Sequence, residues 1–195
     1  MTAPRKFAHI VYRTHHMDDM IAWYTEVLEC KVQHRGEQLA FLTYDDEHHR
    51  VAFLNLGPAP DGKTGMQAQG PSLARSGAGV HHVAYTWDTL GELMDVYKRL
   101  KLRNIMPVTC ILHGLTFSMY YADPDGNGME FQVDVLSLKD AADFMHGPAF
   151  AANPIGDRFD PEEVLAGIAA GKPMAALVLR KDQTMPADGL MVELA

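Results

Sequence analysis

The chain of 195 residues contains little cysteine, no long apolar run and no excess of positive charge. Its two cysteines, Cys30 and Cys110, are too few to indicate a disulfide framework, so we expect reduced thiols. No apolar run approaches the roughly 20 residues that span a bilayer, and no apolar segment follows the first residues as it would in a secretory signal. We therefore expect a cytoplasmic protein that does not act at a membrane.

The net charge of −8 argues against nucleic acid or an anionic lipid surface as the main partner. An apolar content of 47% is ordinary for a globular protein. The length fits one domain, or two small modules that share a core. Ten histidines is a high count, which raises a metal-site hypothesis, and their dispersal along the chain excludes a purification tag.

The most informative pattern is an internal repeat. The segment Phe7–Tyr12 (FAHIVY) returns as Val80–Tyr85 (VHHVAY), which places His82 73 positions after His9. The same displacement aligns Tyr24 with Tyr97. Each copy has the pattern of a strand carrying a histidine, then an amphipathic helix, then three further strands, which is a βαβββ module.

The periodicities predict the elements of both modules. The first module has a strand at 6–13, a helix at 17–28 and strands at 31–34, 39–44 and 51–56. The second has a strand at 80–86, a helix at about 88–101 that Asp88 or Thr89 would cap, and strands near 105–111, 115–122 and 129–134. Residues 57–79 are rich in Gly and Pro and are predicted to be a linker, and 123–128 are predicted to be a turn.

The expected fold class is α+β. The paired modules occupy residues 1–138 and form a curved mixed sheet around a metal site. Residues 139–195 form a C-terminal extension packed on the same domain, with a helix that begins at Pro161 and is capped by Asp160.

Two such modules can place equivalent residues around one concave face. On the first strands the equivalent residues are His9 and His82, and on the fourth strands they are Ala52 and Glu130. Two histidines and one carboxylate leave coordination positions open, as in non-haem Fe(II) oxygen enzymes, and Mn(II) could substitute. Strand alternation leaves His81 as an alternative to His82, because neighbouring strand residues point to opposite faces.

Three segments resemble the vicinal oxygen chelate superfamily and, within it, small one-domain type I extradiol dioxygenases. They are Asp46–Phe53, Gly79–Tyr85 and Phe117–Phe131, and the tail Asn153–Glu163 also resembles the end of small members. The resemblance implies paired modules around Fe(II). It also implies meta cleavage of a catechol of the 2,3-dihydroxybiphenyl type, with both atoms of O2 entering the product.

The resemblance further implies roles for three residues outside the metal triad of His9, His82 and Glu130. His49 would be the acid/base residue, Tyr120 would hydrogen-bond the substrate, and His113 would support the site. Alternation alone leaves His48 and Tyr121 as alternatives to His49 and Tyr120, and His113 could equally be a surface histidine.

Other functions are known on the same scaffold. A metal-dependent isomerase or epimerase of the glyoxalase type usually takes a fourth ligand from the first module, and Ala52 removes the obvious candidate. A ligand-binding resistance protein would lack the metal triad. We expect the partners to be a catechol, O2 and further copies of this chain in a homo-oligomer.

Overall fold

The computed structural model describes residues 2–60 and 78–195. The chain divides into two compact units. The first comprises Met1–Ser72 together with Ala122–Asn127, and the second comprises Leu73–Tyr121 together with Gly128–Ala195. Most of the predicted linker, residues 61–77, lies outside the described residues.

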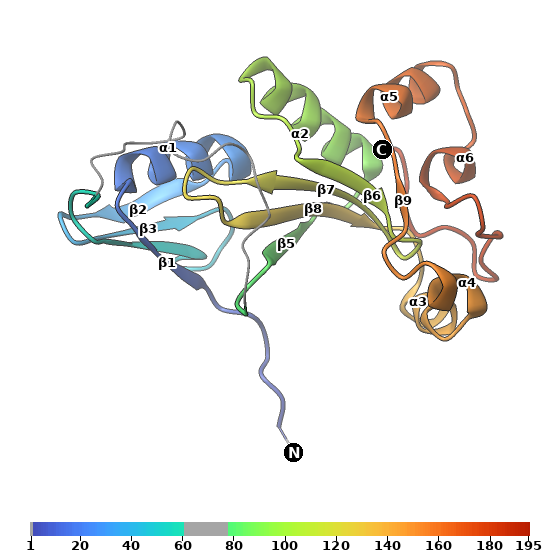
Figure 1. Cartoon of the computed structure of the whole chain (residues 1–195), viewed down its shortest axis with the longest axis horizontal. Coiled ribbons are helices and arrows are strands. Elements are labelled where there is room, and N and C mark those ends of the chain that lie inside the picture. Colours follow the sequence, from blue (N-terminus) through green and yellow to red (C-terminus); the bar gives the residue numbers. More distant parts are fainter. Residues whose placement is uncertain (1, 61–77) are drawn as a thin grey trace. The chain divides into compact units, whose positions relative to one another are not determined.

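The first unit contains the first βαβββ module (Figure 1). Its elements are β1 (Ile10–Thr14), α1 (Met17–Leu28), β2 (Lys31–Arg35), β3 (Leu39–Thr43) and β4 (Val51–Asn55). The strand order is β1-β4-β3-β2, with β1 parallel to β4 and the other pairs antiparallel. Helix α1 covers one face of the sheet, because Met20, Tyr24 and Val27 recur at helical spacing and are fully buried.

The first strand begins later than predicted. The prediction of a strand from residue 6 is wrong, since β1 starts at Ile10. The Nη1 nitrogen of Arg50 donates to the carbonyls of Phe7 and Ala8, at 2.7 and 3.0 Å. These carbonyls are satisfied by a side chain rather than by a neighbouring strand, so the ladder begins only after His9.

A turn from the second module completes the first unit. The predicted turn at 123–128 is confirmed, and most of it belongs to the first unit by its contacts. Buried Asp123 accepts hydrogen bonds from the backbone N–H groups of Asp125 and Asn127, at 3.0 and 2.7 Å, and from the Tyr24 hydroxyl at 3.1 Å. His16 Nδ1 lies 2.7 Å from Asp125 Oδ1. The turn is therefore fixed to α1.

The second unit repeats the module. Its elements are β5 (His82–Thr86), α2 (Leu90–Leu102), β6 (Thr109–Leu112), β7 (Thr116–Ala122) and β8 (Gly128–Asp134). Thr89 caps α2 in a reciprocal capping box with Glu92, as one of the two predicted caps. The prediction of a strand from residue 105 is wrong because Pro107, which has no N–H to donate, precedes the start of β6.

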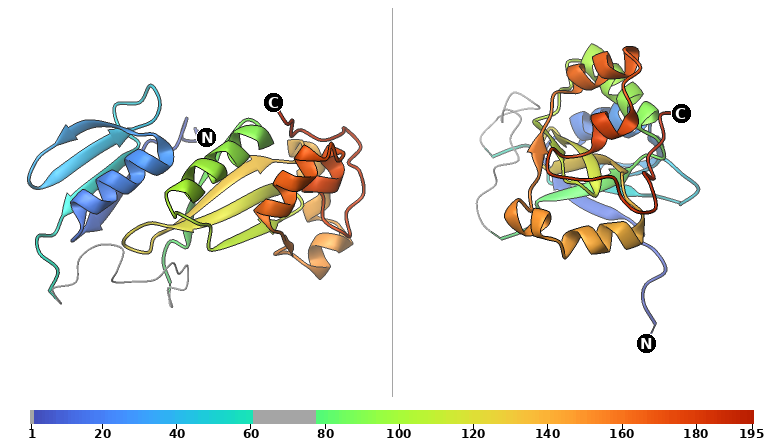
Figure 2. Two further views of the ribbon diagram at one scale, coloured as in Figure 1. Left: turned by 90° about the horizontal axis from the view of Figure 1, so that it is seen from above. Right: turned by 90° about the vertical axis from the view of Figure 1, so that its right-hand side faces the viewer.

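The C-terminal extension packs on the second unit. It forms α3 (Leu138–Met145), α4 (Pro148–Ala152), β9 (Asp157–Arg158), α5 (Pro161–Ala169) and α6 (Met174–Val178). Strand β9 extends the sheet to the order β5-β8-β7-β6-β9, and α5 packs against α2 and α6 (Figure 2). The predicted helix at Pro161 is confirmed, with the Asp160 side chain accepting from the Glu162 N–H at 2.9 Å.

The α+β class with two βαβββ modules is confirmed, and the strands form two mixed sheets, one in each unit. The repeat extends to the cores, because Tyr24 and Tyr97 are both buried and each donates to a carboxylate. Tyr24 donates to Asp123, and Tyr97 donates to Glu162. Among the helices of residues 2–60 and 78–195, none combines the length and hydropathy of a membrane span.

Candidate active site

The second unit gathers three of the predicted site residues, His82, Tyr120 and His113, around the buried carboxylate of a fourth, Glu130. Glu130 on β8 has a side chain only 7% exposed, and its Oε2 lies 2.9 Å from His82 Nε2. The Tyr120 hydroxyl donates to Glu130 Oε1 at 2.7 Å. In the parallel pairing of β5 with β8, Glu130 stands opposite Ala84, which shares a sheet face with His82. The register thus brings His82 and Glu130 together.

His113 extends this network from the turn after β6. Its Nε2 lies 2.7 Å from the Tyr120 hydroxyl and 3.8 Å from Glu130 Oε1. Burial lowers the pKa of His113, although the Glu130 charge and a hydrogen bond with the Ile155 backbone act in the opposite direction. His113 is a partly buried neighbour of Tyr120 and not a surface strand residue.

The two tyrosines of β7 point to opposite faces of the sheet. Burial and the adjacent Glu130 carboxylate raise the pKa of Tyr120, so its hydroxyl keeps its proton. The ring of Tyr121 is fully buried beside Phe131, with ring centroids 4.8 Å apart. Of the two alternatives, Tyr120 is the one that contacts Glu130.

His82, the first residue of β5, and His81, which precedes the strand, also differ in their surroundings. His82 contacts Glu130, whereas His81 is exposed and lies edge-on to the His82 ring, with Nδ1 atoms 2.7 Å apart. His82 also lies against the Tyr120 ring, at a centroid distance of 5.3 Å.

The first unit gathers His9 and His49. Their ring centroids are 4.4 Å apart, and the His49 ring also stacks on Phe41 at 4.4 Å. Desolvation and the nearby His9 lower the pKa of His49, which favours neutral imidazole at neutral pH. The side chain of His48 is 71% exposed, and its Nδ1 lies 2.6 Å from that of His49.

Arg50 holds the segment that carries His9. Its guanidinium pairs with both Asp45 oxygens through Nε, at 3.1 and 2.8 Å, while Nη1 binds the carbonyls of Phe7 and Ala8. The backbone N–H of Ile10 also donates to the Arg50 carbonyl at 3.0 Å. These contacts fix the backbone on both sides of His9. The sequence analysis did not single out Arg50, although it lies within the segment Asp46–Phe53, directly after His49.

The donor chemistry of these side chains suits a divalent metal ion. Imidazole nitrogen and carboxylate oxygen are ligands for Fe(II) and Mn(II), and His82 Nε2 and Glu130 Oε2 already converge. His9 lies in the other unit. In the part of the chain that the structure describes, no cluster of three or more His, Cys, Asp or Glu side chains has the geometry of a metal site.

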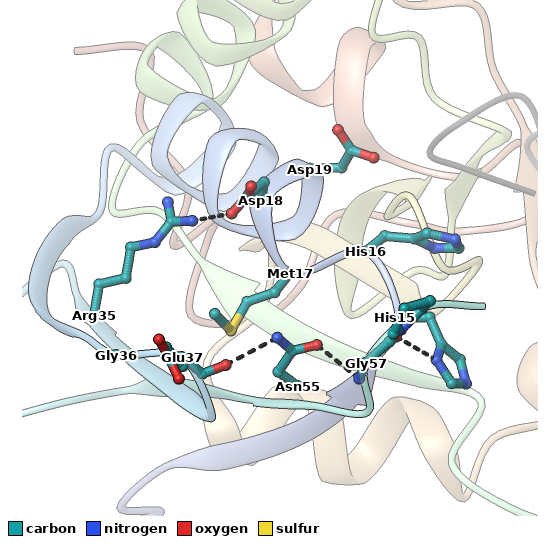
Figure 3. A pocket seen from close by; sticks show the side chains of 11 residues that line it. His15, His16, Met17, Asp18, Asp19, Arg35, Gly36, Glu37, Asn55 and Gly57 are labelled. Atoms are coloured by element: carbon teal, nitrogen blue, oxygen red, sulfur yellow. Dashed lines mark hydrogen bonds and ion pairs between the residues drawn. The ribbon is translucent and has the colours of Figure 1, made fainter.

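A separate cavity of about 820 Å³ lies in the first unit at the start of α1 (Figure 3). It is lined by His15, His16, Met17, Asp18, Asp19, Arg35, Gly36, Glu37, Asn55, Gly57 and Pro58. His15 Nδ1 lies 2.8 Å from the Gly57 carbonyl oxygen, and Arg35 pairs with Asp18. None of the predicted site residues lines this cavity.

Comparison with known proteins agrees with the fold. A family model described as the Glyoxalase/Bleomycin resistance protein/Dioxygenase superfamily matches residues 6–131. The chain belongs to this superfamily. Two relatives from Rhodococcus globerulus are similar over most of their length. Biphenyl-2,3-diol 1,2-dioxygenase 2 is 45% identical, covering 89% of this chain and 87% of the relative. Biphenyl-2,3-diol 1,2-dioxygenase 3 is 38% identical, covering 92% and 90%.

Solved structures support the same superfamily fold. A glyoxalase/dioxygenase from Nostoc punctiforme has 18% identity and a TM-score of 0.51, covering 69% of this chain and 96% of that chain. A lactoylglutathione lyase from Agrobacterium tumefaciens has 18% identity and a TM-score of 0.50, covering 68% and 96%. These two show the fold alone. The curated relatives confirm the predicted enzyme class, an extradiol dioxygenase.

Proposed function

We propose that this dioxygenase uses Fe(II) to cleave catechols of the 2,3-dihydroxybiphenyl class. The single observation that carries the proposal is the contact of His82 and Tyr120 with the buried Glu130 carboxylate. The names of the two Rhodococcus relatives support the substrate class. A homo-oligomer and a cytoplasmic location stay predictions.

His9, His82 and Glu130 would hold the metal, with the paired modules of residues 1–138 acting as one functional domain. His82 and Glu130 supply one nitrogen and one oxygen donor that already converge, and the backbone around His9 is fixed by Arg50. When bound, Fe(II) would supply positions for the two catechol oxygens and for dioxygen, which makes their reaction effectively intramolecular.

His49 would move the substrate proton. Its Nδ1 faces His48, so we assign the proton transfer to Nε2. The lowered pKa keeps the ring neutral and able to accept a proton from a catechol hydroxyl. His49 would return that proton when the ring opens, so it ends the cycle neutral again.

Tyr120 would act as a hydrogen-bond donor and not as a base, because its pKa is raised. It orients the Glu130 carboxylate, and His113 in turn holds the phenol through Nε2. Exact orientation of reacting groups matters greatly, since a misplacement of about 1 Å can cost roughly a hundredfold in rate.

Oxygen uptake tests the proposal. The protein is loaded with Fe(II) under anaerobic conditions and given 2,3-dihydroxybiphenyl, unsubstituted catechol and, as a control, a hydroquinone whose hydroxyls are not adjacent. We expect uptake of one O2 per diol consumed, a yellow ring-opened product with the adjacent diols, and none with the hydroquinone.

Absence of uptake with every adjacent diol, from protein shown to hold iron, would contradict the proposal. Activity that depends on Ni(II), Zn(II) or Co(II) instead would favour isomerase chemistry on the same scaffold.

A further inference from the structure

We propose that Arg180 is a positioning residue that holds His113 beside Tyr120. The effect of Arg180 on catalysis rests on the proposed function. The contacts that suggest its positioning role are independent of that function. Arg180 follows α6 in the C-terminal extension and lies 67 positions after His113 in the sequence. Nothing in the local sequence pattern connects the two residues.

The Arg180 guanidinium is buried and fully oriented by its partners. Its side chain is 0% exposed, and it makes a two-point pair with Asp182, from Nε to Oδ1 at 2.9 Å and from Nη2 to Oδ2 at 2.7 Å. The guanidinium also lies over the Phe144 ring, 5.5 Å from its centroid. The pair with Asp182 leaves Nη1 free to bind other acceptors. A buried cation is stable only when its donors have hydrogen-bond partners.

Nη1 reaches the backbone carbonyls of Asn153 and His113. It donates to the Asn153 oxygen at 2.7 Å and, more weakly, to the His113 oxygen at 3.5 Å. The Asn153 side chain closes a loop by accepting from the Gly156 N–H at 2.9 Å. Ile155 lies within this loop and hydrogen-bonds His113 through its backbone. Arg180 therefore joins the turn that carries His113 to the loop that binds its ring.

Gln183 strengthens the same connection. Its Nε2 donates to the Gly114 carbonyl at 2.9 Å, and its Oε1 accepts from the Arg180 N–H at 3.3 Å. Gly114 has φ +97°, and a Cβ there would lie 2.5 Å from the Phe144 ring. The turn after His113 is thus tightly packed against α3 and held by two side chains of the extension.

A purely structural role would not require this charge. The Asp182 side chain is 44% exposed, so an apolar residue at 180 would leave its carboxylate in water and not buried without a partner. An apolar residue at 180 could fill the volume, but it could not bind the Asn153 and His113 carbonyls. The loss of Arg180 should therefore weaken the contact of the His113 ring with Tyr120 while the chain stays folded.

Nuclear magnetic resonance of the histidine rings tests this in metal-free, full-length protein. Signals of His113 are assigned by their loss in His113→Gln. In Arg180→Met we expect the His113 ring signals to shift or broaden, while those of His34 in the first unit stay in place. Lys181→Met, a neighbouring exposed change, should leave His113 unaltered. Unaltered His113 signals in folded Arg180→Met would overturn the proposal.

A double-mutant cycle tests the consequence for catalysis. With Fe(II) and 2,3-dihydroxybiphenyl, Arg180→Met should lower kcat roughly tenfold or more and change KM much less. In a His113→Gln background the same change should have almost no further effect on kcat, because both substitutions remove the same function, the contact of His113 with Tyr120. Independent, multiplying effects would overturn the positioning role.

The Gln183→Ala variant provides a second test of the same connection. If Arg180→Met does not fold, Gln183→Ala removes the contact with the Gly114 carbonyl and the acceptor for the Arg180 N–H, but leaves the Arg180 guanidinium in place, and should shift the same His113 signals by less. Unshifted signals there would overturn the proposal. If the unaltered protein cleaves no diol, the proposed function fails, while the ring signals still decide whether Arg180 positions His113.

Discussion

The hydroxyl of Tyr120 donates a hydrogen bond of 2.7 Å to Oε1 of Glu130, a carboxylate that is almost wholly buried. A buried charged acceptor gains more from such a bond than an exposed one, about 1.5–3 kcal/mol. The relationship links a proposed metal ligand to a residue that would face the substrate. It also predicts different effects on kcat for substitution of Tyr120 and of its neighbour Tyr121.

Tyr120→Phe should lower kcat by about tenfold to a hundredfold, because Glu130 loses a donor that orients it. Tyr121→Phe is the matched control. Among the described residues, the Tyr121 hydroxyl is buried without a hydrogen-bond partner, so its removal should leave kcat unchanged and stability equal or slightly higher. Steady-state kinetics and thermal denaturation measure both. Equal loss of kcat in the two variants would contradict the assignment.

His49→Gln should lower kcat by about a hundredfold or more, since general acid–base catalysis contributes on that order. His48→Gln should stay within about threefold of the unaltered protein, because the His48 side chain is largely exposed. Because the pKa of His49 is lowered, the midpoint of the acidic limb of the pH–rate profile should lie below the usual histidine pKa of about 6.5. A profile unchanged in His49→Gln would exclude His49 as the acid/base residue.

Asp45→Asn should destabilise the protein at neutral pH and not in strong acid. The hydrogen bonds from Arg50 are the main cause of the lowered pKa of Asp45. A carboxylate with a lowered folded-state pKa contributes stability above its unfolded-state pKa, about 3.9. That contribution is lost as the pH falls through the lower folded-state value. Denaturant unfolding across this range should show the two proteins converging in acid.

Asp46→Asn, at an exposed neighbouring position, is the control for the Asp45 experiment. It should change stability little at any pH. A difference between Asp45→Asn and the unaltered protein that persists undiminished in strong acid would show that the Arg50 pair is not its source.

Gly156→Ala should destabilise the second unit by about 2 kcal/mol or more. Gly156 has φ +105°, and an added Cβ would collide with the Leu112 carbonyl oxygen, a backbone atom that cannot yield easily. Gly171→Ala is the control, because Gly171 has φ +68° with open space around the added atom. It should cost about 1 kcal/mol from conformation alone. Similar losses in unfolding experiments would contradict the packing argument.

The sequence predicted elements that depend on local periodicity. Helix α1 spans the predicted residues 17–28, because its apolar stripe and acidic first turn are encoded within the helix itself. The strand starts at residues 10 and 109 were not predictable in the same way. One depends on the distant Arg50 side chain and the other on Pro107, which the strand pattern had included.

The candidate site was predictable as a set of residue types but not as a set of contacts. Alternation could not separate His81 from His82 or Tyr120 from Tyr121, since that choice depends on the register of β5 on β8 and on which face packs against α2. Arg180 carried no signal, because its partners Asn153 and His113 lie 27 and 67 positions away.

The most direct test of the central claim is a turnover of Fe(II)-loaded protein with 2,3-dihydroxybiphenyl under isotopically labelled dioxygen, followed by mass spectrometry of the product. An extradiol dioxygenase that uses this substrate must place both labelled atoms in a ring-opened product. A labelled product with one atom, or an unlabelled product with the ring intact, would contradict the account.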